Sequence, residues 1–89
     1  MKLFMVHVGF YDAEVGEGIY ESHKNFFIAA SNAKSAKKKT FNLEQFKNKK
    51  MHKDGIKEIS DVEGYKVILE KSSHKNKSKV YSYNESKKL

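Results

Sequence analysis

Apolar residues along the chain fall into short runs with two different spacings. In the nearly continuous run over residues 2–10, the even positions Phe4, Val6, Val8 and Phe10 are apolar, and the odd positions are more mixed. A run with a period of two predicts a β-strand, and apolar residues on both faces indicate a central strand. We expect the even-numbered side chains to face the core.

A second strand and a helix are expected next. Residues 11–22 contain glycines and carboxylates without a period and predict a loop, and residues 23–30 alternate like a strand. Ser31 and Asn32 are both suitable helix N-caps. Apolar residues then recur at helical spacing, so the pattern predicts a helix over 32–47.

The remaining segments predict further strands. Residues 51–60 are expected to form a strand with a bulge at Gly55, because their isoleucines are spaced unevenly for a flat strand. Residues 61–64 indicate a turn, and 65–71 alternate well. The predicted order is β-β-α-β-β. The fold class is therefore α+β, a two-layer sandwich with one helix on one face of an antiparallel or mixed sheet, and a fifth strand is possible near 80–83.

The length of 89 residues limits the chain to one small domain. We assign residues 1–71 to a single α+β domain. Residues 72–89 are rich in Lys and Ser and predict a tail, with the optional edge strand near 80–83.

Positive charge is spread over most of the chain. The formal net charge is +7, all 18 basic residues are lysines, and the acidic excess is confined to residues 1–23. Such asymmetry is compatible with an anionic partner such as nucleic acid, but we interpret it first as a solvated lysine surface that keeps a small protein soluble. The candidate anion-binding residues are Lys37, Lys38, Lys39, Lys49 and Lys50.

Several chemistries have no support in the sequence. The absence of cysteine excludes disulfides, thiolate metal sites and a cysteine nucleophile. No phosphate-binding glycine loop, serine-hydrolase elbow or zinc-protease motif occurs, so we expect no cofactor. No apolar run is long enough to cross a membrane, and no signal-peptide cleavage site follows residues 2–10, which predicts a cytoplasmic protein without a membrane partner.

Two groups of polar residues mark a candidate site. Glu21, His23 and Asn25 are spaced by two, as are His52 and Asp54. In a strand, each group points to one side. If the two segments are neighbours in the sheet, imidazoles and carboxylates converge and form a ligand site.

The residue types leave more than one interpretation of these groups. His23 and His52 are candidate metal ligands, because neutral imidazole and carboxylate both bind divalent cations. Alternatively, all of these residues are ordinary hydrogen-bonding groups at exposed strand ends. His7 lies inside the apolar run and is interpreted as a core or dimer-face histidine rather than a ligand.

Short motifs in the right order resemble those of the DUF1543 family of small bacterial proteins. The start at 2–4 with Gly9, the Glu-x-His motif within 21–25, the His-x-Asp motif within 51–54 and the hairpin at 62–67 all resemble that family's pattern. The resemblance implies an α+β fold and no assigned activity.

The resemblance also singles out residues that the spacing had identified: Glu21, His23, His52 and Asp54. We therefore expect a small bacterial binding or interaction module without catalytic activity, self-associating as a homodimer because a thin core leaves apolar strands to cover. One alternative is a nucleic-acid, nucleotide or anion binder. The other is a metal-dependent enzyme that uses these four residues.

Overall fold

The computed structural model describes residues 1–43, 51–73 and 78–89 of the chain. Its elements are strands β1 (Lys2–Phe10), β2 (Ser22–Ala30), β3 (Met51–Ile59), β4 (Asp61–Val62) and β5 (Tyr65–Lys66), helices α1 (Ala33–Phe41) and α2 (Tyr83–Lys87), and the 3-10 turn η1 (Gly16–Gly18). The described part has the predicted α+β class, with one helix packed against an antiparallel sheet.

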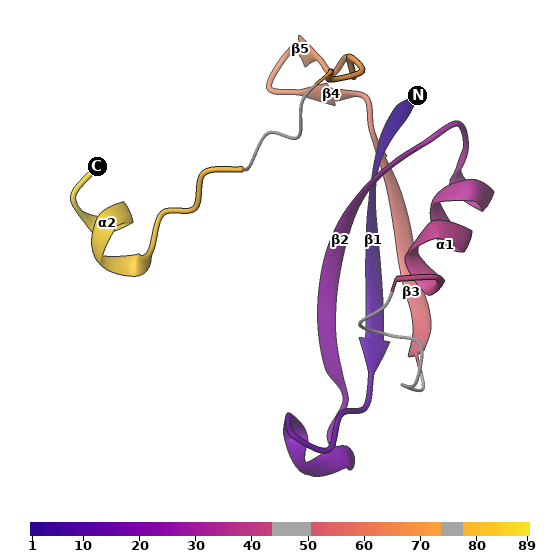
Figure 1. Cartoon of the computed structure of the whole chain (residues 1–89), viewed down its shortest axis with the longest axis vertical. Coiled ribbons are helices and arrows are strands. Elements are labelled where there is room, and N and C mark those ends of the chain that lie inside the picture. The colour runs from indigo at the N-terminus through magenta and orange to yellow at the C-terminus, as the bar shows by residue number, and fades with distance from the viewer. Residues whose placement is uncertain (44–50, 74–77) are drawn as a thin grey trace.

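The sheet has three long strands in the order β2-β1-β3, with β1 antiparallel to both neighbours (Figure 1). Val6 at the centre of β1 lies opposite Phe26 on one side and Ile56 on the other. Since opposite residues share a face, the even-numbered positions of β1 and their partners form one side of the sheet.

Helix α1 covers that even-numbered side and completes the core. Phe4, Val6 and Val8 are at most 2% exposed, and Ala36 of α1 is fully buried against them. This confirms the predicted core face of the first strand. The buried hydroxyl of Thr40 is satisfied because Oγ1 donates to the carbonyl of Ala36 at 2.9 Å.

The helix begins as expected and ends earlier than expected. Asn32 is the N-cap, and its side chain accepts a hydrogen bond from the Ser35 backbone N–H at 2.8 Å. The prediction of a helix over 32–47 was too long, because α1 ends at Phe41. Asn42, a weak helix former, is the C-cap. Residues 44–47 of the predicted helix lie outside the described residues.

The bulge in the third strand is confirmed, and the strand predicted over 65–71 is wrong in length. The pairing of β1 with β3 shifts register between His7 and Val8, beside Gly55. Only Tyr65–Lys66 pairs as β5, in a tight hairpin with β4 whose two turn residues both have positive φ. Residues 68–71 then run as irregular chain.

The optional strand near 80–83 is replaced by a helix. Residues 78–82 form no strand, and α2 begins at Tyr83. Ser82 accepts from the Glu85 backbone N–H at 3.2 Å, the N-terminal half of a Ser-x-x-Glu capping pattern that the sequence prediction did not use. Every residue of α2 is exposed, and residues 74–77 lie outside the described chain.

Candidate functional site

The sheet face that α1 leaves open carries the predicted site residues. Their positions follow from the register, because His7 and Gly9 of β1 lie opposite Asn25 and His23 of β2, and Gly9 lies opposite His52 of β3. We call Glu21, His23, His52, Asp54 and His7 the histidine–carboxylate cluster. It occupies the end of the open face nearest the loop between β1 and β2.

The two predicted segments converge, although they are not neighbours in the sheet. Strands β2 and β3 lie on opposite sides of β1, so their backbones are about 9–10 Å apart. Their side chains meet over Gly9. A Cβ atom at position 9 would overlap Glu21 Oε1 and lie 2.8 Å from His52 Nε2. Because Gly9 has no side chain, Glu21 and His52 can occupy the space above it.

Four of the residues contact one another directly. His52 Nε2 contacts Glu21 Oε1 and lies 3.2 Å from Asp54 Oδ1. His23 Nε2 lies 3.2 Å from Asp54 Oδ2 and 3.6 Å from Glu21 Oε1. Each histidine thus contacts both carboxylates. The expected juxtaposition is present, and the role of these residues as ligands stays a prediction.

The bulge in β3 positions Asp54. Because Gly55 pairs with His7 and Lys53 pairs with Val8, Asp54 is the extra residue that has no partner in β1. A bulge bends its strand and redirects a side chain, which is a frequent arrangement beside functional sites. Here it allows one carboxylate to reach histidines from two different strands.

His7 belongs to the cluster, and the sequence interpretation of it as a core or dimer-face residue was incomplete. Its Nδ1 lies 2.6 Å from Asn25 Oδ1, and its ring stacks on that of His23 with centroids 5.2 Å apart. The alternation of side chains along β1 could have identified this role of His7 from the sequence. His7 and Gly9 share the odd face of β1, whereas the buried residues Val6 and Val8 occupy the even face.

The cluster is open to solvent. The side chains of His23 and His52 are 44% and 52% exposed, and those of Glu21 and Asp54 are both 32% exposed. Exposed ion pairs contribute only about 0–1 kcal/mol each, so stability alone is a weak reason for gathering these groups. Their accessibility allows a ligand to reach them directly from water.

Each half of the cluster brings three possible metal-ligand atoms close together. Taking one ligand atom from each residue, His7, His23 and Asp54 form a group whose atoms all lie within 4.8 Å of one another, and Glu21, His52 and Asp54 form a second such group. Imidazole nitrogen and carboxylate oxygen are the donors that zinc and similar dications prefer where no thiolate is present.

The predicted anion-binding lysines do not gather at this cluster. Lys39 Nζ donates to the carbonyl of Ala29 at 2.7 Å, and Lys37 lies 6.0 Å from the ring centre of Phe41, so both are partly engaged by the fold. Lys38 is exposed on α1, and Lys49 and Lys50 lie outside the described residues. Their role in binding anions stays a prediction.

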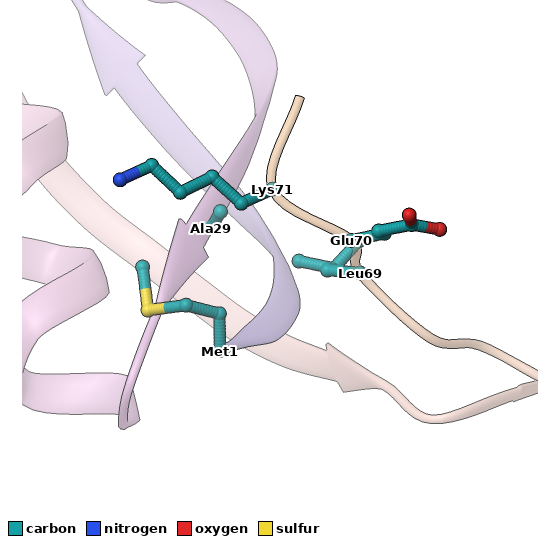
Figure 2. Close-up of a pocket in the computed structure, with 5 residues that line it drawn as sticks. All are labelled: Met1, Ala29, Leu69, Glu70 and Lys71. Carbon is teal, nitrogen blue, oxygen red and sulfur yellow. The ribbon is translucent and has the colours of Figure 1, made fainter. Parts of the chain in front are cut away.

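A separate hollow of ≈ 450 Å³ lies toward the other end of the open face (Figure 2). It is lined by Met1, Ala29, Leu69, Glu70 and Lys71. In Figure 2 the Leu69 side chain points toward Ala29 and Met1, whereas the Glu70 carboxylate points away. Ala29 is six residues along β2 from His23, about 20 Å in an extended strand, so this hollow is distinct from the cluster.

Within the described residues, no helix is both long enough and apolar enough to cross a membrane. No family model, no curated protein and no solved structure matches the chain. The resemblance to the DUF1543 family therefore stays a prediction, and inference about function depends on the cluster itself.

Proposed function

We propose that this protein is a small binding module whose ligand is a divalent transition-metal ion, bound by the histidine–carboxylate cluster. The observation that carries the proposal is the convergence of three imidazoles and two carboxylates at one end of the open sheet face, with Glu21 and His52 meeting over Gly9. No single ion pair requires this convergence, whereas a metal ion requires several donors at once.

Charge and donor type support a dication as the ligand. Glu21 and Asp54 each contact the same histidines, so two negative charges are held close together on a chain with net charge +7. A dication placed between the carboxylates removes their repulsion. The imidazoles favour zinc, cobalt, nickel or copper over magnesium, which prefers oxygen ligands and retains its waters.

The proposal is tested by calorimetric titration of the full chain with Zn²⁺ at neutral pH. Asp54→Asn should weaken zinc binding by at least about 10–100-fold, which is the cost of changes even to outer-shell partners of a metal. Glu58→Gln is the matched control, because Glu58 lies on the same strand as Asp54 but outside the cluster. Its carboxylate pairs with Lys2 at 3.5 Å. The proposal fails if the unmodified chain takes up no zinc or if both variants bind it equally.

Self-association is a second proposal, carried by a different observation. Phe27 of β2 is 65% exposed on the open face, opposite Met5 of β1. We propose that a second copy of the chain covers this apolar half of the face, because a large exposed aromatic is costly to leave in water. Phe27→Glu should lower the mass measured by sedimentation equilibrium, and a monomeric unmodified chain at high concentration would refute the proposal.

The remaining alternatives receive less support. A nucleic-acid or anion binder depends on lysines of which two, Lys37 and Lys39, are already engaged within the fold. A metal-dependent enzyme needs a substrate site beside the cluster, and the apolar hollow at Ala29 lies away from it. A cytoplasmic location stays a prediction of the sequence.

A further inference from the structure

The cluster divides into two ligand groups that share one residue. The first contains His7 and His23, the second contains Glu21 and His52, and Asp54 belongs to both. We propose that the cluster is a dinuclear site in which the carboxylate of Asp54 bridges two divalent metal ions, one held by each group. This inference rests on the proposed metal-binding function and specifies the number of ions and the ligands of each.

The two oxygens of Asp54 are already directed toward different histidines. Oδ2 lies 3.2 Å from His23 Nε2, and Oδ1 lies 3.2 Å from His52 Nε2. With metal–ligand bonds of about 2.0–2.1 Å, two ligand atoms of a tetrahedral ion lie about 3.3 Å apart. Each oxygen–nitrogen pair therefore matches one edge of a metal coordination shell, and a carboxylate with one oxygen in each shell is a bridge.

The first ion site is completed by His7, whose orientation is fixed by Asn25. Nδ1 of His7 lies 2.6 Å from Asn25 Oδ1, an acceptor, so Nδ1 donates this hydrogen bond and Nε2 remains available to a metal. An outer partner that fixes the tautomer of a ligating histidine is a usual feature of metal sites. The rings of His7 and His23 are stacked with an interplanar angle of 4°, so the exposed His23 ring must turn before both in-plane nitrogen lone pairs face the same ion.

The second ion site is built over Gly9. Glu21, immediately before β2, and His52 from β3 reach across the central strand and contact each other there. Together with Asp54 Oδ1 they offer two oxygens and one nitrogen. The two sites thus differ in donor set, since the first offers two nitrogens and one oxygen. We therefore expect different affinities and stepwise filling by metals that favour nitrogen.

Stoichiometry and magnetic coupling test the inference on the full chain. Zinc titration should show two ions bound per chain. When two equivalents of Cu²⁺ are bound, ions bridged at about 3.5–4 Å should couple, and the electron paramagnetic resonance signal should fall well below that of two isolated ions. Glu58→Gln, outside the cluster, should retain both properties.

Variants separate the two sites. His52→Ala should leave one uncoupled Cu²⁺ at the first site, and His7→Ala should leave one at the second. Because His7 is partly buried, His23→Ala, at an exposed position, provides a second test of the first site. Asp54→Asn should abolish the coupling.

Three results would overturn the inference. A single ion per unmodified chain would leave metal binding intact and refute the second site. Two ions with an uncoupled signal would refute the bridge. No bound ion at all would refute the proposed function together with this inference.

Discussion

Replacing Gly9 by alanine should remove metal binding at the second ion site without harming the fold. The added Cβ would overlap Glu21 Oε1 and lie 2.8 Å from His52 Nε2, and both atoms are the ends of flexible, solvent-exposed side chains. These side chains can turn into solvent, so the backbone of β1 need not move. The second ion site, formed by Glu21, His52 and Asp54, then loses two of its three ligands.

Gly9→Ala should have a small effect on the free energy of unfolding and a large effect on zinc affinity. Glycine within a strand is about 0.5–1 kcal/mol less favourable than alanine, and each exposed ion pair that Gly9→Ala breaks is worth about 0–1 kcal/mol. The free energy of unfolding should thus stay within about 1 kcal/mol of the original, a melting shift of no more than about 4–8 °C for a domain of this size. Zinc affinity at the second site should fall by more than about 100-fold, because the ion loses direct ligands and not only outer-shell partners.

Thermal melting followed by circular dichroism and calorimetric zinc titration are the two assays. Gly55→Ala is the matched control, because a Cβ at position 55 would meet nothing within 4 Å. It should bind zinc as the unmodified chain does. Full zinc affinity at both sites in Gly9→Ala would refute the claim that the second site needs the space above Gly9. An equal loss of zinc affinity in Gly55→Ala would refute it as well.

Three further predictions concern the core, the helix and the site. Phe4→Ala removes a ring that is 2% exposed and should lower the free energy of unfolding, measured by urea denaturation, by about 3–5 kcal/mol. A decrease below about 1 kcal/mol would contradict the assigned core. Asn32→Ala removes the N-cap bond to Ser35 and should cost about 1 kcal/mol, whereas Asn32→Asp should retain most stability; equal losses would argue against capping. Zinc should bind more tightly at about pH 7.5 than at about pH 5.5, because protons compete with metal for the imidazoles, and a flat profile would exclude histidine ligands.

Local patterns of the sequence predicted most of the fold. The alternation over residues 2–10 identified the buried side of β1, and Asn32 correctly marked the start of α1. The uneven spacing of the isoleucines indicated the bulge beside Gly55. These features depend on neighbouring residues in the chain, where side-chain period and capping chemistry act directly.

Strand order and helix length depended on long-range packing and were harder to predict. The apolar run over residues 2–10 predicted a central strand, but nothing in the polar spacing of β2 or β3 shows that these two strands flank it, so their adjacency entered only as a condition. The alternation of β1 already placed His7 on the same face as Gly9, but its contact with Asn25 depends on the register of β2 on β1.

The most direct test of metal binding is a long-range ¹H–¹⁵N spectrum of the histidine rings during zinc addition. If the cluster binds two ions, one ring nitrogen in each of His7, His23 and His52 shifts to the position of a metal-bound nitrogen as zinc is added, with saturation at two equivalents. If all three rings kept their metal-free shifts with zinc in excess, the histidine–carboxylate cluster would not be a metal site.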